Sequence, residues 1–135
     1  MKIGYTTGVF DMFHIGHLNI LKRAKEQCDF LIVGVSTDEL VHDYKNKWPI
    51  IPFENRKAIV EACRYVDKVV PQVTMDKLQA LKELRFDVMF HGDDWKGTDL
   101  YNNYEKEFAE YGAEIIYIPH TAGVSSSMLR DKLNK

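Results

Sequence analysis

Short apolar segments alternate along this chain with segments of helical periodicity, and this alternation limits the folds that the chain can adopt. Each apolar segment is rich in β-branched and aromatic residues, a composition typical of buried strands. The predicted strands are Lys2–Thr7, Phe30–Ser36, Lys68–Val70, Asp87–His91 and Glu114–Ile118. The predicted helices are His17–Gln27, Asn55–Arg64, Asp76–Leu84, Asp99–Tyr111 and Ser126–Leu133.

Strands that are short and continuous, and that are separated by helices, favour a parallel sheet with helices packed on both faces. Right-handed crossovers then give an α/β fold, namely a Rossmann-like three-layer α/β/α sandwich around a five-stranded parallel sheet. The chain has 135 residues, of which 45% are hydrophobic, and this is enough for one domain with its own core. We therefore expect a single domain over residues 1–135.

Composition excludes several classes of protein. The net charge is −2, from 18 basic and 20 acidic residues, whereas a general nucleic-acid binder has a basic excess. No apolar run approaches the roughly 20 residues that a membrane helix needs, and the N-terminus does not have the pattern of a signal peptide. We therefore expect a cytoplasmic protein that binds neither nucleic acid nor membrane. Cys28 and Cys63 lack CxxC spacing and are expected to be reduced core residues.

The segment that follows the first predicted strand holds the most informative group of polar residues. It places His14 and His17 three residues apart around Gly16, at the junction of a strand and a helix. It is neither a GxGxxG fingerprint nor a P-loop. A helix N-terminus attracts anions, and imidazolium donors beside it can stabilise the charge of a reacting phosphoryl group. Zinc binding is disfavoured because no third ligand follows at suitable spacing, and either histidine alone would be interpreted as a capping or core residue.

These residues carry a resemblance to a known family. Gly8-Val9-Phe10-Asp11 with His14-Ile15-Gly16-His17 resembles the GxFDxxHxGH signature of nucleotidylyltransferases that make CDP-alcohols. Three later segments make the resemblance closest to the glycerol-3-phosphate cytidylyltransferases. They are Arg64-Tyr65-Val66-Asp67 (family element RYVD), Gly92-Asp93-Asp94-Trp95 (GDDW) and Thr121-Ala122-Gly123-Val124-Ser125-Ser126 (TEGIST).

The resemblance implies an enzyme that transfers CMP from CTP to glycerol phosphate and forms CDP-glycerol and pyrophosphate. The acceptor attacks the α-phosphorus directly and in line. A phosphate acceptor is already anionic near neutral pH, so the site must supply alignment and charge neutralisation rather than a general base. The resemblance also implies Mg²⁺ as cofactor, held mainly by the triphosphate, a homodimer, and a role in teichoic acid or capsule biosynthesis.

The roles of individual residues are implied in the same way. His14, His17, Lys45 and Arg56 are expected to be catalytic, and Lys45 and Lys47 to bind the acceptor from a mobile polar loop at Val41–Phe53. The carboxylate of Asp94 can accept a hydrogen bond from the cytosine amino group, beside the aromatic face of Trp95. The expected nucleotide-binding residues are Gly8, Val9, Phe10, Asp11, Gly16, Arg64, Asp94, Trp95, His120, Thr121, Ser125 and Ser126.

Two positions depart from the family pattern. His120 stands where the family commonly has Arg, so a permanent charge becomes one that titrates near pH 6.5. Val9 stands where the glycerol-phosphate enzymes have Thr, and choline-phosphate relatives often carry Val there. Glycerol 3-phosphate, glycerol 2-phosphate, phosphocholine and phosphoethanolamine therefore stay open as acceptors. An adenylyltransferase for FMN or a sugar phosphate, a non-catalytic nucleotide sensor and a flavodoxin-like domain also stay open as classes of protein.

Overall fold

The structure is a computed structural model and describes residues 1–119, so the predicted helix at Ser126–Leu133 lies outside the described residues. The elements are β1 (Ile3–Gly8), α1 (Ile15–Glu26), β2 (Phe30–Ser36), α2 (Asp38–Lys45), α3 (Phe53–Glu61), β3 (Lys68–Gln72), α4 (Lys77–Leu84), β4 (Val88–Gly92), the 3₁₀ turn η1 (Asp93–Trp95), α5 (Asp99–Glu110) and β5 (Glu114–Ile118).

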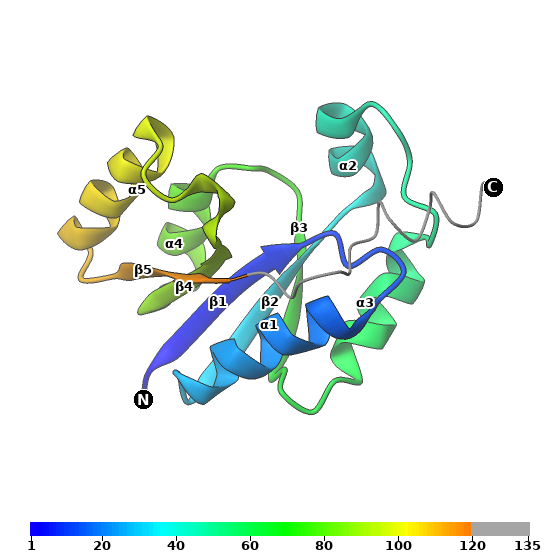
Figure 1. The fold of residues 1–135 in the computed structure, drawn as a ribbon, viewed down its shortest axis with the longest axis horizontal. Helices are drawn as coiled ribbons and strands as arrows, with labels where there is room; N and C mark the ends of the chain where they lie inside the picture. Colours follow the sequence, from blue (N-terminus) through cyan, green and yellow to red (C-terminus); the bar gives the residue numbers. More distant parts are fainter. Residues whose placement is uncertain (120–135) are drawn as a thin grey trace.

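All five strands are parallel and lie in the order β3-β2-β1-β4-β5, as Figure 1 shows. This arrangement confirms the predicted five-stranded parallel sheet. The chain builds the sheet outward from β1 through β2 to β3, and then returns to the other side of β1 to add β4. The order of strands therefore reverses between β1 and β4, and ligands bind at such a switch point, beyond the carboxyl ends of the strands.

Helices cover both faces of the sheet, which confirms the three-layer arrangement. On one face, Leu21 of α1 and Val60 of α3 belong to a core cluster that includes Val33 of β2. On the other face, Leu81 of α4 and Phe108 of α5 belong to a second cluster, which includes the neighbouring residue of β2, Ile32. Neighbouring residues of a strand point to opposite faces, so a buried central strand supplies both cores, and this explains its continuous apolar sequence.

Helix α2 was not predicted and corrects the expected loop at Val41–Phe53. The side chain of Thr37 accepts a hydrogen bond from the backbone N–H of Leu40, which caps the helix, and Val41 is buried. Asp38 and Glu39 in the first turn complement the helix dipole, and the helix ends where Asn46 takes a left-handed conformation. Only residues 46–52 of the predicted loop are irregular. The short turn η1 was not predicted either.

Within residues 1–119, no helix is long and apolar enough to cross a membrane. Cys28 and Cys63 are both partly buried free thiols that pack against the cluster on the α1 and α3 face, as expected.

Candidate active site

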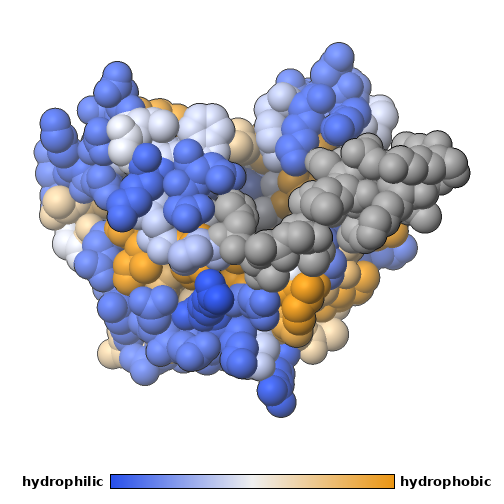
Figure 2. Space-filling model, in the orientation of Figure 1, coloured by the Kyte–Doolittle hydropathy of each residue, from blue (hydrophilic) through white to orange (hydrophobic). Residues whose placement is uncertain are grey.

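A cavity of about 370 Å³ opens at the carboxyl edge of the sheet, where β1 and β4 diverge. Figure 2 shows this region as a notch in a largely hydrophilic surface, between α2 on one side and the end with α4 and α5 on the other. The volume is in the range of small-ligand sites. The lining residues are Thr6–Asp11, His17, Ile20, Ser36, Tyr44, Lys45, Gln72, Met75, Lys77, His91, Gly92, Asp94 and Trp95.

The loop after β1 adopts an unusual backbone conformation. Phe10 and Met12 have φ angles of 55° and 51°, in the left-handed region that residues other than glycine rarely adopt. The Phe10 ring is buried in the core and lies under Gly8, where an added Cβ would approach that ring to 3.0 Å. The core therefore holds the strained loop in place, and the absence of a side chain at Gly8 permits the close approach.

His14 and His17 form a reciprocal cap on helix α1. The backbone N–H of Gly16 donates to Nδ1 of His14 over 3.0 Å, and the backbone N–H of His14 donates to Nδ1 of His17 over 3.2 Å. The two rings stack with their centroids 3.9 Å apart. A nitrogen that accepts a backbone N–H cannot carry a proton, so each neutral ring carries its proton on Nε2. Capping thus orients both side chains, and it leaves Nε2–H as the donor of each ring.

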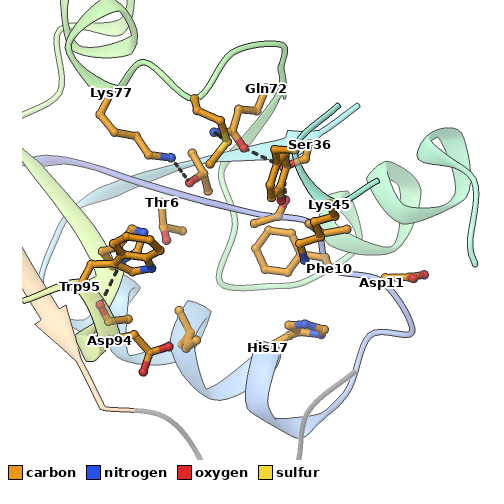
Figure 3. Close-up of a pocket in the computed structure, with 18 residues that line it drawn as sticks. Thr6, Phe10, Asp11, His17, Ser36, Lys45, Gln72, Lys77, Asp94 and Trp95 are labelled. Carbon is orange, nitrogen blue, oxygen red and sulfur yellow. Dashed lines mark hydrogen bonds between the residues drawn. The ribbon is translucent and has the colours of Figure 1, made fainter. Parts of the chain in front are cut away.

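The electrostatics of this pair correct the expectation of imidazolium donors. Burial lowers the pKa of His17 to about 4, with a smaller contribution from the neighbouring His14. Partial burial also lowers the pKa of His14. Both rings are therefore neutral near pH 7, and they act as hydrogen-bond donors rather than as positive charges. Of the two, His17 lines the cavity (Figure 3).

Arg56 occupies a different place from the one expected of a phosphate-binding residue. Its side chain is 1% exposed and is absent from the cavity lining. The guanidinium donates to the backbone carbonyls of Ile51, Val9 and Ser36 over 2.7–2.8 Å. It also forms a 2.6 Å ion pair with Asp38. Four N–H bonds of the guanidinium thus have protein acceptors, and this placement indicates a structural role for Arg56.

Asp11 is likewise directed to the protein rather than to the cavity. Its carboxylate oxygens each accept a backbone N–H, from Ile50 and from Ile51, over 2.9 Å. Figure 3 shows its carboxylate pointing away from the centre of the cavity, although other atoms of the residue line the wall. Asp11 therefore fastens residues 46–52 to the loop after β1.

The predicted basic residues separate into two groups. Lys45, on α2, lines the cavity, as Figure 3 shows. Lys47 is exposed in the loop after α2, and neither it nor Arg64 lines the cavity. The guanidinium of Arg64 lies over the ring of its neighbour Tyr65, 5.1 Å from the centroid, beside a different depression between α1 and α3.

The nucleotide-binding residues expected near the C-terminus cannot be placed, whereas those of η1 can. Asp94 and Trp95 line the cavity on the side opposite His17 and Lys45 (Figure 3). Gly8, Val9 and Phe10 line it from the loop after β1, and Gly16 is buried at the start of α1. His120, Thr121, Ser125 and Ser126 lie outside the described residues.

Lys77 is the most important cavity residue that the sequence did not predict. It is 4% exposed, and its Nζ donates to the Thr7 hydroxyl over 2.9 Å. Burial lowers the pKa of its ammonium group to about 8. Nearby, the hydroxyl of Ser36 and the side-chain amide oxygen of Gln72 are 2.7 Å apart. The signal was present in the sequence: Lys77 follows the N-cap residue Asp76 soon after β3, and in a parallel sheet that position is at the carboxyl edge.

A Rossmann-like sheet that opens such a cavity beside helix-capping histidines is typical of nucleotidyltransferases, and comparisons with known proteins refine this class. A model of the family described as cytidylyltransferase-like matches residues 5–132. The glycerol-3-phosphate cytidylyltransferase of Bacillus subtilis (strain 168) is 37% identical over 134 residues, covering 98% of each chain. The chain therefore belongs to the cytidylyltransferase-like family.

Two further relatives carry names of different activities. The ethanolamine-phosphate cytidylyltransferase of Dictyostelium discoideum is 44% identical over 98 residues, which cover 69% of this chain and 26% of that protein. The crystal structure of the lipopolysaccharide core biosynthesis protein from Thermoplasma volcanium GSS1 matches with a TM-score of 0.74 and 26% identity. That match covers 90% of this chain and 97% of the other.

Replacing Arg56 with Met tests its structural role. The substitution leaves the Asp38 carboxylate and the three carbonyls without the guanidinium, so we expect a loss of about 2–4 kcal/mol in the free energy of unfolding. Urea denaturation followed by circular dichroism measures this. Arg64→Met is the matched control, because it removes an exposed guanidinium, and its stability should stay within about 0.5 kcal/mol of the unmodified protein. An Arg56→Met protein as stable as this control would contradict the role.

Proposed function

We propose that this chain transfers CMP from CTP to a glycerol phosphate, forming CDP-glycerol and pyrophosphate. The observation that carries the proposal is the presence of two separate places for anionic groups in one cavity. His17 and Lys45 lie on one side, and Lys77 with Thr7 lies on the other (Figure 3). A nucleotide sensor needs a single phosphate site, whereas a transferase must hold the phosphates of a donor and of an acceptor together.

The nucleotide is assigned to the part of the cavity bordered by His17 and η1. The Nε2–H groups of His14 and His17 are donors for phosphate oxygens at the start of α1, where the helix dipole also favours an anion. The Asp94 carboxylate is an acceptor for the cytosine amino group, and Trp95, with half its surface exposed, offers an aromatic face beside it. The name of the Bacillus subtilis relative, which is 37% identical to this chain, supports cytosine as the base.

The acceptor is assigned to the part of the cavity around Lys77. The ammonium group of Lys77 would neutralise the acceptor phosphate, and Thr7, Ser36 and Gln72 present neutral hydroxyl and amide groups. Such groups suit the hydroxyls of glycerol. A quaternary ammonium acceptor would instead favour a carboxylate or an aromatic cage, and the Asp11 carboxylate is engaged elsewhere.

The chemistry then requires alignment and charge neutralisation. The acceptor phosphate oxygen attacks the α-phosphorus of CTP, and pyrophosphate leaves from the opposite side. Lys45 and the Nε2–H donors of the histidines would stabilise charge on the phosphoryl oxygens in the transition state. Mg²⁺ would enter with the triphosphate and be held mainly by its oxygens and by water.

The homodimer, the cytoplasmic location and the link to teichoic acid or capsule biosynthesis remain parts of this proposal. The glycerol-3-phosphate cytidylyltransferase relatives support the reaction class, and a molar mass measured in solution tests the dimer. The ethanolamine-phosphate relative keeps phosphoethanolamine as a second candidate acceptor.

Pyrophosphate release measured with a matrix of substrates tests the proposed reaction. CTP and ATP are each combined with glycerol 3-phosphate, glycerol 2-phosphate, phosphocholine, phosphoethanolamine and FMN in the presence of Mg²⁺. We expect release with CTP and a glycerol phosphate, reduced at least about 100-fold in His17→Ala, because a transition-state donor is lost. Pyrophosphate release only with ATP, or no release at all, would contradict the proposed reaction. Release with CTP and phosphoethanolamine would overturn the acceptor.

The pH dependence of acceptor use tests Lys77. Because its pKa is about 8, the ammonium charge is present at pH 7 and is lost as the pH rises through 8. We expect kcat/KM for glycerol phosphate to fall above about pH 8, with KM for CTP changing less. Lys77→Arg should remove this fall, because a guanidinium stays charged, and Lys77→Met should raise the acceptor KM at every pH. An unchanged profile in Lys77→Arg would show that another group titrates.

A further inference from the structure

His91 stands at the carboxyl end of β4 and lines the cavity beside η1. Its Nδ1 lies 3.0 Å from the carbonyl oxygen of the next residue, Gly92. Its Nε2 lies 3.0 Å from the hydroxyl of Tyr101, which comes from the first turn of α5. The imidazole therefore joins the start of the turn to a helix on one face of the sheet.

The partners of the ring fix its tautomer. A carbonyl oxygen can only accept, so Nδ1 must carry the proton that is donated to Gly92. Nε2 is then an acceptor, and the Tyr101 hydroxyl donates to it. Tyr101 is 5% exposed, and burial raises its pKa to about 12, so the phenol keeps its proton at neutral pH. The two hydrogen bonds therefore run in one direction: the Tyr101 hydroxyl donates to His91, and His91 donates to the Gly92 carbonyl.

Gly92 is the N-cap residue of η1, and it has no side chain with which to cap that turn. The turn carries Asp94 and Trp95, and its backbone is held by local hydrogen bonds such as that from the Lys96 N–H to the Asp93 carbonyl. The ring of Tyr101 also lies 6.2 Å, centroid to centroid, from that of Trp95. His91 and Tyr101 thus connect a short exposed turn to the buried part of the fold.

We propose that His91 and Tyr101 are positioning residues that orient η1 for binding of the nucleotide. This inference rests on the proposed function, because it takes Asp94 and Trp95 as the nucleotide side of the cavity. Neither residue need touch the reacting atoms. Their effect is to hold the Gly92 carbonyl, and with it the direction in which the turn leaves β4.

Substitutions at both positions test the inference through binding of CTP. Tyr101→Phe removes the donor to Nε2, and His91→Leu removes both hydrogen bonds. His91→Asn retains an N–H near the position of Nδ1 and can still donate to Gly92. Tyr111→Phe is the matched control, because it removes an exposed hydroxyl from the far end of the same helix. Thermal unfolding of each variant confirms that it is folded at the assay temperature.

We measure Kd for CTP by titration calorimetry, and KM for each substrate together with kcat. We expect Tyr101→Phe to raise Kd and KM for CTP about tenfold, because one hydrogen bond is lost, and His91→Leu to raise them further, because two are lost. In both variants kcat and the acceptor KM should stay within about twofold. His91→Asn should match Tyr101→Phe in CTP affinity, because it keeps the donor to Gly92 and loses only the hydrogen bond from Tyr101, and Tyr111→Phe should match the unmodified protein.

Unchanged CTP affinity in folded Tyr101→Phe and His91→Leu proteins would overturn the inference, as would equal losses for CTP and the acceptor. Failure of His91→Asn to exceed His91→Leu in affinity would also count against it. If the unmodified protein binds CTP but transfers nothing, the proposed reaction fails while the positioning role is still decided by calorimetry. If the unmodified protein does not bind CTP, both fail.

Discussion

The buried guanidinium of Arg56 is the interaction on which the geometry of the cavity depends most. It joins the loop after β1 through Val9, the end of β2 through Ser36, and the segment before α3 through Ile51. Its ion pair with Asp38 adds the start of α2. A buried charge is tolerated only when its hydrogen-bonding groups are paired, so these segments and the guanidinium specify one another's positions.

The elements held in this way carry the groups that face the ligand. Asp11, in the loop after β1, accepts two further hydrogen bonds from residues 50–51. This loop is therefore held both by Arg56 and by the segment before α3. The strained backbone at Phe10 and Met12 persists because of such surroundings, and it leads directly into the cap formed by His14 and His17. Lys45 enters the cavity from α2, whose first turn is fixed by Arg56. Orientation is thus set by backbone and buried contacts within the protein, which is what positioned donors require.

Much of the fold follows from the sequence, because the signals involved are local. The predicted limits of β2 and β5 agree with the structure, since runs such as Phe30–Ser36 are continuous, apolar and bounded by polar residues. Helix α2 was missed because its eight residues are mostly polar, and its cap at Thr37 was overlooked beside the charged residues that suggested a loop. A short amphipathic helix at the rim of a sheet has too few buried residues to show a clear period.

The site was predicted less completely, for a physical reason. Motifs identified His17, Lys45, Asp94 and Trp95, all of which line the cavity. The motifs did not show that the side chain of Lys77, rather than that of Arg56, reaches the cavity. Residue type alone does not reveal where a long side chain ends. The structure buries the guanidinium of Arg56 among protein acceptors and brings Lys77, on a helix after the edge strand, into the cavity. Which basic side chain reaches the cavity depends on the spatial order of the strands, and this order places the end of β3 near the end of β1.

Among the described residues that line the cavity, Lys77, whose lowered pKa leaves some neutral amine, and His17 carry nitrogen atoms that can act as nucleophiles. In the proposed mechanism the site only aligns the two substrates and neutralises their charge, so that CMP passes directly to the acceptor. The stereochemistry at the α-phosphorus decides between these routes. CTP carrying sulfur at one defined α-position is used with glycerol phosphate, and the configuration of the CDP-glycerol product is determined by ³¹P NMR. Direct transfer predicts inversion of configuration; retention would mean a cytidylylated enzyme intermediate and would contradict the proposed mechanism.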